Sequence, residues 1–519
     1  MTVSLHLQVI LKNMLKIIDD FLNRTTMYKV VLYYLLALWV IAFVFSFVGI
    51  LPYTPFSMVI SLFILLGVSW ATNNIFSYVF EVPANIESIY ISVFILALII
   101  TPALTPSEYI FLGWAGILAM ASKYIFAIKH KHIFNPVAFS VAVTAFFLNQ
   151  GASWWVGTVA MAPFVLVGGL MIVKKIKRKD LALSFFIVAL ITISFFTLLN
   201  KGNIFNSLYN ALSYSPILFF TFIMITEPLT TPPSSFLRIL YGTLVGFLFA
   251  PQIHIGTFYL TPELALLFGN IFSYLVSPKK RLTLKLKRAV QIAPDTAEFI
   301  FTPDSKLNFK PGQYLEWTLG HEKVDSRGNR RYFTIASSPT EKELHLGVKF
   351  YPNGSSFKKA LAFMEDGDKI IASQLSGDFV LPRNRKKKLV FIAGGIGITP
   401  FRSMIQYLID TKQKRDIVLI YSNKTKIDIV YKDIFDKAKD CFNFKTVYTL
   451  TDLKDGQTNW MGRKGYVDGK MILDEVKDWD ERTYYISGPP SMVSGTEQVI
   501  KNLGLSSRHI KTDFFPGFA

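Results

Sequence analysis

The sequence of 519 residues has few of the side chains that build redox metal centres. Cysteine occurs once, at Cys441, so no disulfide can form within the chain and no four-thiolate iron–sulfur cluster can be built. The first 278 residues contain only four histidines, His6, His130, His132 and His254. Two stacked haems need four paired axial ligands, which these scattered histidines do not supply. We therefore expect no haem, no iron–sulfur cluster and no metal site.

Charged side chains are scarce in the first half of the chain, where hydrophobic residues form long runs. Hydrophobic residues make up 51% of the sequence, and the mean hydropathy is +0.37, which is rare for a soluble enzyme of this size. An apolar helix of about 20 residues spans the core of a bilayer. The pattern predicts about ten membrane spans, at residues 28–51, 57–79, 88–104, 108–128, 134–148, 154–173, 181–199, 213–229, 235–250 and 259–276.

Few ionisable groups interrupt these runs. Lys123 lies within the fourth span, and Glu227 and Glu263 lie at span ends. An acidic group inside a membrane is a candidate for an ion path, but these are sparse and peripheral, which argues against ion pumping. No cleavable signal-peptide pattern is present. Residues 1–27 are expected to form a cytoplasmic or interfacial segment, with an amphipathic surface helix over His6–Phe21.

Lysine and arginine indicate the orientation of the spans. They gather before the first span, after the fourth, sixth and tenth, and at the start of the ninth, with Lys201 as the exception. Ten spans would place these groups on the cytoplasmic side. We expect a multi-pass protein of the bacterial cytoplasmic membrane, with both termini in the cytoplasm. Basic residues beside anionic lipid explain much of the net charge of +19, so lipid is an expected partner and nucleic acid is not.

The second half of the chain has the pattern of two soluble domains. Over residues 282–384, short alternating runs between Pro, Gly and Asp predict an antiparallel β-barrel, with strands at Leu282–Val290, Glu298–Phe301, Tyr314–Leu319 and Leu344–Phe350. Over residues 385–519, strands alternate with helices, which predicts a doubly wound α/β domain with a parallel sheet. Its strands are expected at Leu389–Ala393, Ile417–Tyr421 and Tyr484–Ser487, and its helices at Arg402–Thr411, Asp433–Lys439 and Met492–Leu503. Residues 28–278 complete the fold class as a transmembrane helical bundle.

Three motifs follow one another in this half. They are Arg331-Tyr332-Phe333-Thr334, Gly394-Gly395-Ile396-Gly397-Ile398-Thr399-Pro400 and Ser487-Gly488-Pro489-Pro490-Ser491-Met492. In this order, with Pro311-Gly312-Gln313-Tyr314 before them, they resemble the flavin and nicotinamide sites of the ferredoxin-NADP reductase family. The resemblance covers essentially all of residues 282–519 and implies that FAD and NAD(P)H are the cofactors.

The resemblance implies roles for the first motif, in the cofactor-binding stretch that includes Tyr332. Arg331 pairs with an FAD phosphate, a charge-assisted bond that suits a guanidinium group. Phe333 lies against the isoalloxazine ring, and Thr334 offers its hydroxyl or backbone to flavin N5 as a catalytic residue. An ordinary strand with an exposed arginine is the alternative.

A second segment suits the FAD pyrophosphate. Gly354, Ser355 and Ser356 follow a predicted strand and open a predicted helix at Phe357–Met364. Backbone N–H groups at a helix N-terminus bind phosphate. The alternative is a plain hairpin turn.

The glycine-rich motif suits a nicotinamide nucleotide. Gly394, Gly395 and Gly397 let the backbone approach a pyrophosphate, and Thr399 and Pro400 open the next helix. NADH and NADPH both stay open. Ser422 and Lys424, after the strand ending at Tyr421, suit a 2′-phosphate, and no Asp or Glu sits directly there to hold a 2′-hydroxyl.

The third motif departs from the family at the hydride site. The family has Cys-Gly-Pro beside the nicotinamide, whereas this chain has Ser487-Gly488-Pro489, with Met492 following. Ser487 is therefore a candidate catalytic residue with a hydroxyl where the family has a thiol, and Gly488, Pro489 and Met492 are candidate cofactor contacts. The aromatic tail resembles tails that cover the flavin, which makes Phe515 a candidate catalytic residue and Phe518 a candidate cofactor contact; buried anchors are the alternative.

Two motifs in the membrane half suit a second flavin. His132-Ile133-Phe134-Asn135-Pro136 and Ile225-Thr226-Glu227-Pro228-Leu229-Thr230-Thr231-Pro232 resemble stretches of the membrane flavoprotein subunits RnfD and NqrB. The resemblance implies non-covalent FMN or riboflavin near residues that include hydrogen-bonding side chains and a helix-breaking proline, namely His132, Asn135, Pro136, Thr226, Thr230 and Thr231. Those families attach FMN to a Ser/Thr-Gly-Ala-Thr motif, and the nearest stretch here, Gln150-Gly151-Ala152-Ser153, lacks the first hydroxyl. Ordinary helix capping at Asn135-Pro136 is the alternative.

Together these features predict a membrane-bound NAD(P)H-dependent flavin oxidoreductase. Electrons are expected to pass from cytoplasmic NAD(P)H through FAD to flavin in the membrane domain. From there they would reach a membrane acceptor or an extracytoplasmic one, such as a flavinylated protein. Two alternatives stay open: an NAD(P)H:quinone reductase whose acceptor is in the bilayer, and a flavin transporter with a fused reductase.

Overall fold

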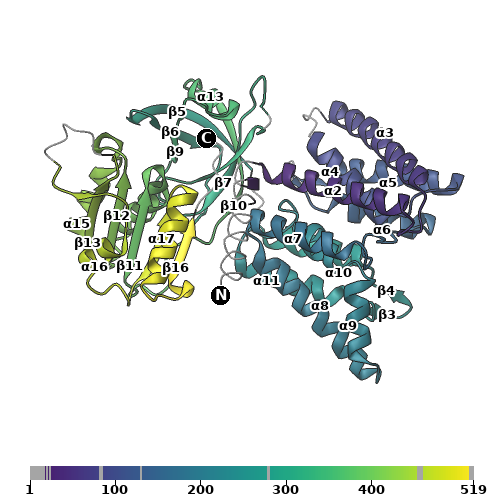
Figure 1. Cartoon of the computed structure of the whole chain (residues 1–519). Coiled ribbons are helices and arrows are strands. Elements are labelled where there is room, and N and C mark those ends of the chain that lie inside the picture. The colour runs from purple at the N-terminus through teal and green to yellow at the C-terminus, as the bar shows by residue number, and fades with distance from the viewer. Residues whose placement is uncertain are drawn as a thin grey trace. The chain divides into compact units, whose positions relative to one another are not determined.

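The chain forms two compact units. The computed structural model describes residues 18, 21–22, 25–80, 86–128, 131–277, 281–325, 327–452 and 460–513. The division falls between Lys279 and Lys280, and we call the two parts the N-terminal unit and the C-terminal unit. Helices make up nearly all of the first, whereas the second combines two sheets with helices (Figure 1).

The N-terminal unit is built on apolar helices. They are α2 (Met27–Phe47), α3 (Pro55–Val79), α4 (Ile86–Ile99), α5 (Pro106–Ile125), α6 (Pro136–Leu148), α7 (Ala162–Ile176), α8 (Lys179–Leu199), α9 (Ile204–Ser213), α10 (Ile217–Phe219), the π-helix η1 (Phe220–Met224), α11 (Ser235–Leu248) and α12 (Pro262–Val276). Two short hairpins interrupt them, β1 (Ala127–Ile128) with β2 (Lys131–His132) and β3 (His254–Ile255) with β4 (Phe258–Tyr259). Several helices begin where the sequence offers an N-cap: Thr54 and Asn135 each accept a hydrogen bond from an amide of the first turn.

Three of the described helices are long and apolar enough to cross a membrane: α2, α3 and α8. In their most apolar stretches 28%, 33% and 39% of the residues are buried within the structure, so most side chains there face outward. A fourth candidate is the pair α9 and α10–η1, which bends by 63°. Each predicted span contains a helix, but a ten-helix transmembrane bundle and its orientation remain predictions.

Two predicted spans differ from the structure. The sixth, expected at 154–173, begins with non-helical backbone, and its helix α7 starts only at Ala162. Here Trp154 N–H bonds to the Ile99 carbonyl at 2.8 Å, which pairs this segment with the end of α4. The eighth, expected at 213–229, is helical only over the continuous stretch of α10 and η1, and α9, from which this stretch bends by 63°, was not predicted.

Close glycine packing joins α8 to α11. Gly242 and Gly246 are spaced as Gly-x-x-x-Gly on α11, a pattern that lets helix backbones approach each other. A Cβ atom at Gly246 would lie 2.6 Å from the Phe185 carbonyl oxygen, and one at Gly242 would meet the Ser184 hydroxyl. The contact between the two helices therefore depends on the absence of a side chain at Gly242 and at Gly246.

The C-terminal unit begins with a six-stranded antiparallel barrel. Its strands are β5 (Leu282–Ala293), β6 (Thr296–Pro303), β7 (Tyr314–Thr318), β8 (Arg330–Thr334), β9 (Leu344–Lys349) and β10 (Lys369–Ser376), in the order β8-β7-β10-β5-β6-β9. Helix α13 (Ser356–Ala362) contributes Phe357 and Leu361 to the barrel core, beside Trp317 of β7. The sequence did not predict β10, and it placed α13 one residue late.

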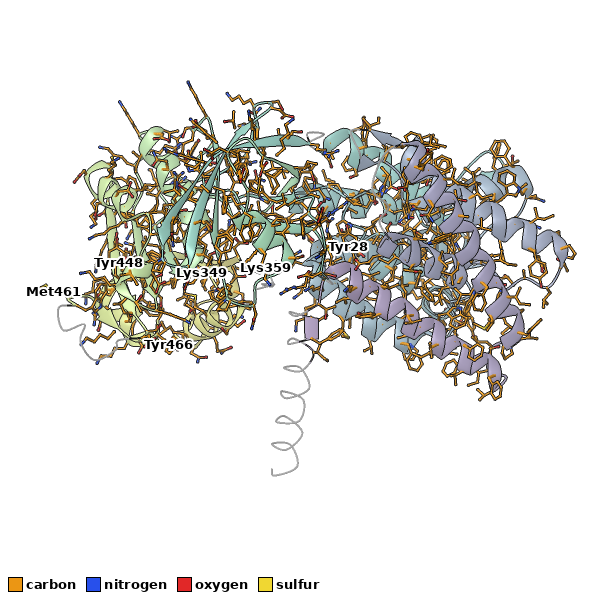
Figure 2. All side chains as sticks on the ribbon, turned by 90° about the horizontal axis from the view of Figure 1, so that it is seen from above. Tyr28, Lys349, Lys359, Tyr448, Met461 and Tyr466 are labelled. Carbon is orange, nitrogen blue, oxygen red and sulfur yellow. The ribbon has the colours of Figure 1, made fainter. Side chains whose placement is uncertain are left out.

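A second sheet follows, with every pairing parallel. Its strands are β11 (Leu389–Gly394), β12 (Ile417–Asn423), β13 (Phe444–Leu450), β14 (Arg463–Lys464), β15 (Thr483–Ser487) and β16 (Ile510–Asp513), in the order β14-β13-β12-β11-β15-β16. The turns and helices between them are η2 (Gly395–Ile398), α14 (Thr399–Asp410), η3 (Lys426–Asp428), α15 (Lys432–Cys441), α16 (Gly469–Glu475), α17 (Pro490–Asn502) and η4 (Ser507–His509). This is the predicted doubly wound arrangement, although β13, β14, β16 and α16 were not predicted. Met461 and Tyr466 flank the edge strand β14 and are exposed (Figure 2).

Candidate functional site

The motif Arg331–Thr334 forms strand β8, at the edge of the barrel sheet. Arg331 and Phe333 point to the same face, opposite Trp317 and Leu315 of β7. The Arg331 guanidinium lies 5.4 Å from the centre of the Phe357 ring, and the Phe333 ring lies 6.0 Å from it. The structure therefore brings the Arg331 motif against α13, the helix that follows the second predicted FAD segment.

Basic groups gather where β8 meets α13. Arg331 Nη1 donates to the carbonyls of Arg327 and Gly328, at 2.8 and 3.1 Å. Burial lowers the pKa of Arg331 to about 10, although Asp325 opposes the shift. Lys358 is also buried and donates to the Lys349 carbonyl at 2.8 Å.

The pKa of Lys358 shows that the cluster suits an anion. Burial, with the nearby charges of Arg331 and Arg327, lowers this pKa to about 8. The lowered pKa values of Arg331 and Lys358 mean that the protein disfavours their charged forms, and a bound anion would stabilise those forms. The cluster therefore fits the diphosphate of FAD.

The N-terminus of α13 already holds one carboxylate. Ser355 caps the helix, and Ser356 N–H donates to Asp325 at 2.8 Å. His321 Nε2 and Ser356 Oγ lie 2.9 Å apart, and Arg327 Nη2 reaches the Gly354 carbonyl at 3.3 Å. Burial would raise the pKa of Asp325, but bonds from Ser356 and Arg327 outweigh it and bring the pKa to about 2. These donors thus stabilise negative charge, and a bound diphosphate would share them with Asp325.

The glycine-rich motif forms the turn between β11 and α14, at the carboxyl end of a central strand. A Cβ atom at Gly397 would lie 2.5 Å from the Ser487 carbonyl oxygen, and one at Gly394 would lie 2.7 Å from Met492 Sδ. Gly395 has a φ of +52°. The structure therefore packs the two predicted nicotinamide motifs against each other, at neighbouring strand ends where ligands bind in such sheets.

Around this turn Ser487, Thr399 and Pro400 are buried, whereas Gly488 is half-buried and Pro489 is exposed. Ser487 ends β15 beside Ala393 and is 4% exposed. A Cβ atom at Gly488 would lie 2.8 Å from Met492 Sδ, and Pro489 precedes α17. Thr399 opens α14 ahead of Pro400, and its hydroxyl donates to the Ile396 carbonyl at 3.2 Å.

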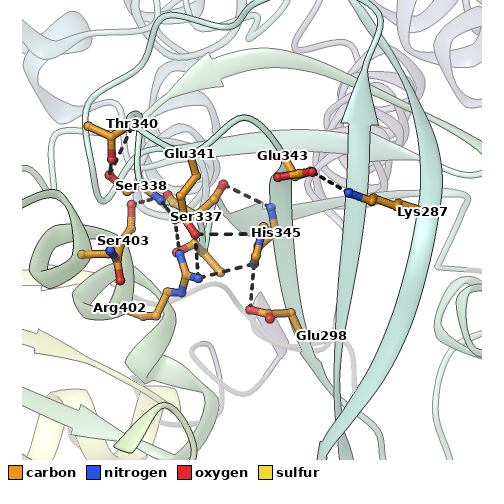
Figure 3. A network of polar contacts seen from close by, with 12 residues as sticks. Lys287, Glu298, Ser337, Ser338, Thr340, Glu341, Glu343, His345, Arg402 and Ser403 are labelled. Atoms are coloured by element: carbon orange, nitrogen blue, oxygen red, sulfur yellow. Dashed lines mark hydrogen bonds and ion pairs between the residues drawn. The ribbon is translucent and has the colours of Figure 1, made fainter. Parts of the chain in front are cut away.

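The barrel contacts the glycine-rich turn directly. A Cβ atom at Gly347 of β9 would lie 2.9 Å from Thr399 Cγ2 and 3.3 Å from Ile396 Cδ1. Arg402 of α14 donates to the Ala336 carbonyl at 3.2 Å and pairs with Glu341 (Figure 3). No local pattern in the sequence indicates this network, because Arg402 lies 61 residues from Glu341 and 66 from Ala336 and only the fold brings them together.

Other predicted residues have different outcomes. Thr334 is buried at the end of β8, opposite Tyr314. Tyr332 lies on the other face from Arg331, and its hydroxyl donates to Glu316 at 2.8 Å. Phe515 and Phe518 lie outside the described residues.

The predicted end of β12 was wrong. Ser422 and Asn423 continue the strand and are buried, and only Lys424 of this stretch is exposed. A 2′-phosphate role for Ser422 therefore lacks the exposed position that we expected.

In the N-terminal unit, three predicted flavin contacts lie around the carboxylate of Glu227, which was not itself predicted as a contact. Glu227 Oε2 accepts from Asn135 Nδ2 at 2.8 Å and from Thr230 Oγ1 at 3.3 Å. Glu227 Oε1 lies 3.3 Å from His132 Nε2. Asn270 Oδ1 accepts from the backbone N–H of Asn135 at 2.8 Å, and Asn270 Nδ2 donates to the Tyr241 hydroxyl at 3.0 Å. A continuous polar cluster thus lies among the apolar helices.

The other predicted flavin contacts bond within the protein. Thr226 Oγ1 donates to the Phe222 carbonyl at 2.8 Å, and Thr231 Oγ1 donates to that of Glu227 at 2.9 Å. Pro136 occupies the first turn of α6, and Asn135 Oδ1 accepts from Ala138 N–H at 3.0 Å. Asn135 therefore caps a helix, as the alternative interpretation required, and a flavin contact remains a proposal.

Two protein-family models match the C-terminal unit. The oxidoreductase FAD-binding domain matches residues 283–379, and the oxidoreductase NAD-binding domain matches residues 391–498. These ranges contain the Arg331 motif and α13 in the first, and the glycine-rich turn and Ser487 in the second. Neither range extends into the N-terminal unit.

Curated relatives and solved structures match about the same half of the chain. The reductase subunit of glycine betaine monooxygenase from Chromohalobacter salexigens is 27% identical over 242 residues, 45% of this chain and 64% of that protein. NADH-cytochrome b5 reductase 1 from Mortierella alpina is 28% identical over 235 residues, 44% of this chain and 77% of that protein.

Among solved structures, the Amycolatopsis cytochrome P450 reductase GcoB aligns with a TM-score of 0.41 and 24% identity, over 46% of this chain and 70% of its own. The FAD/NAD-binding domain of the Vibrio cholerae nitric oxide dioxygenase aligns with a TM-score of 0.40 and 16% identity, over 45% of this chain and 98% of its own. The two family matches and the site geometry agree: the C-terminal unit is the FAD- and NAD-binding module of a ferredoxin reductase-type, NAD(P)H-dependent flavoprotein oxidoreductase.

Proposed function

We propose that this protein is a membrane-bound flavin oxidoreductase that takes electrons from cytoplasmic NAD(P)H. In this proposal they pass through FAD in the C-terminal unit to flavin in the N-terminal unit, and on to an acceptor in the membrane or outside the cytoplasm. The observation that carries the proposal is the meeting of the FAD segments and the nicotinamide motifs in a single unit, on a chain whose other unit has helices long and apolar enough to cross a membrane.

Each part of the C-terminal unit has a role in this proposal. Arg331 and Lys358, with the amides of α13, hold the FAD diphosphate through charge-assisted bonds. Thr334, at the end of β8, would face the flavin ring. When bound, FAD supplies an acceptor for the hydride of NAD(P)H that can release its two electrons singly.

The glycine-rich turn positions the donor. Gly394 and Gly397 keep side chains out of the space between two strand ends, so the backbone of α14 can approach the nucleotide diphosphate. Ser487 places a hydroxyl at the hydride site, and we propose that it orients the nicotinamide through a hydrogen bond. The named relatives support this activity, because both are reductases.

The N-terminal unit would hold the second redox group. We infer that FMN or riboflavin binds without a covalent bond near the polar cluster of His132, Asn135, Glu227 and Thr230, which lies among apolar helices and offers both donors and acceptors. Polar groups in an apolar unit need partners, and in this structure they bond to one another. The final acceptor would be a quinone or an extracytoplasmic flavinylated protein.

Two measurements test the proposal on the full-length protein. The first is flavin content after purification: we expect FAD together with FMN or riboflavin, and FAD alone would refute the relay. The second uses sealed proteoliposomes with NADH or NADPH inside and a membrane-impermeant electron acceptor outside. We expect reduction of the outside acceptor by the wild type and slower reduction by Arg331→Ala, because this variant binds FAD more weakly. No reduction by a wild type that oxidises NAD(P)H inside would contradict electron transfer across the membrane.

A further inference from the structure

One network joins the barrel to the parallel-sheet domain inside the C-terminal unit, and we call it the Arg402 bridge. It comprises Arg402 and Tyr431 from the parallel-sheet domain and Glu298, Glu341 and His345 from the barrel side. Figure 3 labels Arg402 and its three partners from the barrel side. Arg402 is 5% exposed. Its two terminal nitrogens contact the two Glu341 oxygens, Nη2 at 2.9 Å from Oε1, and its guanidinium lies 5.8 Å from the centre of the Tyr431 ring.

The bridge also reaches the backbone of residues 336–338 on the barrel side. Arg402 Nη1 donates to the Ala336 carbonyl at 3.2 Å, and Ser403 Oγ donates to the Ser337 carbonyl at 2.6 Å. Glu341 in turn accepts from Ser338 N–H at 2.5 Å. The three residues 336–338 are therefore tied to the first turns of α14.

A second carboxylate extends the contact. Glu298 of β6 accepts from the Tyr431 hydroxyl at 3.0 Å and lies 3.3 Å from His345 Nδ1. Tyr431 has a φ of +59°, a left-handed conformation that is unfavourable for a residue with a side chain. The bond to Glu298 and the ring contact with Arg402 hold this conformation at the start of α15.

The charges of the bridge support each other. Burial would raise the pKa of Glu298, but His345, Arg402 and Tyr431 outweigh it and lower that pKa. Burial would lower the pKa of Arg402, but Glu341 and Glu298 outweigh it and raise that pKa. Both groups therefore stay charged across the neutral range.

The bridge lies next to both motifs that are predicted to bind the reacting cofactors. Ala336 follows Thr334 by two residues, and Arg402 follows Pro400 by two residues. The bridge thus joins the end of the flavin segment to the end of the glycine-rich turn. Hydride transfer needs reacting atoms about 3–3.5 Å apart, and a misplacement of about 1 Å lowers the rate by about a hundredfold.

We propose that Arg402 is a positioning residue for hydride transfer, because its paired contacts with Glu341 and the Ala336 carbonyl set the approach of the nicotinamide to the flavin. The hydride carries two electrons and one proton from the reduced nicotinamide to the flavin, and oxidised nicotinamide is released. In this proposal Arg402 acts through Glu341 and the Ala336 carbonyl and not on the reacting atoms. The inference rests on the NAD(P)H-dependent reduction proposed above.

Lysine at position 402 is the informative change. It keeps the positive charge, but a single ammonium cannot reproduce the paired geometry of a guanidinium and also reach the carbonyl. We expect Arg402→Lys to lower the limiting rate of FAD reduction by about 10- to 100-fold. Glu341→Gln should lower it less, and the double variant should be no slower than Arg402→Lys, because both changes break one contact.

Arg482 provides a matched control. It is also buried, and it pairs with Asp416 and Asp478 at 2.6 Å, but it lies at the opposite strand ends of the same sheet. Arg482→Lys should lower the melting temperature and leave the limiting rate within about twofold of the wild type, since loss of a buried pair affects stability.

Stopped-flow reduction of the full-length protein by NADH and by NADPH, without oxygen, separates the outcomes. It yields the limiting rate and the nicotinamide Kd, and FAD content is measured on the same samples. A slower limiting rate in Arg402→Lys, with FAD content retained and the Kd within about twofold, supports the proposal. An unchanged rate overturns it, and so does a loss that merely follows FAD content or that Arg482→Lys shares. If the wild type is reduced by neither nucleotide, the proposed function itself fails.

Discussion

The two units stabilise their buried polar groups in different ways. In the C-terminal unit, buried arginines pair with carboxylates from other elements, as Arg402 does with Glu341 and Arg482 with Asp416. In the N-terminal unit, Glu227 is held by the neutral donors Asn135 and Thr230 and by His132. The contact between α8 and α11 in that unit combines the close backbone approach at Gly246 with an ion pair between Asp180 and Arg238.

This difference shows where each unit can hold a ligand. The barrel gathers Arg331 and Lys358 into one cluster at the cost of lowered pKa values, so its polar groups are arranged for an anion. The polar groups of the N-terminal unit already bond to one another, and any flavin there must share or exchange these bonds. We therefore expect substitutions at the candidate site of the C-terminal unit to change binding and rate, and substitutions in the N-terminal unit to change stability first.

The largest expected effect is at the glycine-rich turn. Gly397→Ala would place a Cβ atom 2.5 Å from the Ser487 carbonyl oxygen, so the two nicotinamide motifs must separate. We expect FAD reduction by NAD(P)H to slow by about a hundredfold or more. FAD content, measured by dithionite reduction of the same sample, should stay near the wild-type value because the FAD segments lie in the barrel.

Gly495→Ala is the matched control for this change. Gly495 lies inside α17, and a Cβ atom there would have nothing within 4 Å. Alanine at a helical glycine should stabilise the unit by up to about 1 kcal/mol without altering the reduction rate. Equal rates for the two variants would show that the close contact of the motifs does not matter for the donor site.

The next effect concerns the basic cluster. Arg331→Ala removes a charge-assisted bond worth about 1.5–3 kcal/mol, so we expect the FAD Kd to rise by about 10- to 100-fold. Arg331→Lys should recover part of the affinity, because it restores the charge without the planar fork. Flavin titration followed by fluorescence measures both values, and an unchanged Kd for the alanine variant would contradict the phosphate role.

A smaller effect is expected in the N-terminal unit. Gly246→Ala places a Cβ atom 2.6 Å from the Phe185 carbonyl oxygen and should destabilise the α8–α11 contact by about 1–3 kcal/mol. Hydrogen exchange in α8 and α11 would measure this, and FAD reduction should not change. Gly113→Ala on α5 is the control, since a Cβ atom there meets nothing within 4 Å. Slower FAD reduction in Gly246→Ala would contradict the expectation that a change in the N-terminal unit leaves the chemistry of the C-terminal unit unaffected.

The sequence predicted the elements whose motifs are local. Leu389–Ala393 was expected as a buried strand before the glycines, and β11 ends at Gly394 as that pattern requires. Hydropathy alone failed at residues 154–161, because an apolar segment reads the same whether it is helical or extended. Here Trp154 has a φ of +54° and pairs with the end of α4. Strand β13 was missed because Lys445 and Thr446 interrupt its apolar residues.

The site could be predicted only where one segment supplies it. The glycine-rich turn and the Arg331 motif each carry their chemistry within a few residues. The Arg402 bridge does not, because Arg402 and Glu341 are 61 residues apart and become partners only when the barrel contacts α14. Glu227 and His132 are 95 residues apart, so neither motif alone indicated that the carboxylate would join them.

The smallest expected effect is a pH dependence of FAD binding. Burial and the charges of Arg331 and Arg327 lower the pKa of Lys358 to about 8, so in the absence of FAD this lysine loses its proton as the pH rises through 8. The protonated form attracts the diphosphate, so bound FAD raises that pKa and affinity falls at alkaline pH. A rise of about one unit predicts about a fivefold weaker affinity at pH 9 than at pH 7.

The control for this prediction is Lys358→Met, which keeps an unbranched side chain one atom shorter and removes its charge. Its FAD Kd should be weaker than that of the wild type at pH 7 and nearly constant up to pH 9, because no group with a pKa near 8 then faces the diphosphate. Titrations at both pH values measure the difference. If the wild type and Lys358→Met show the same pH dependence, another group controls it, and the basic cluster would then stabilise the flavin through its arginines alone.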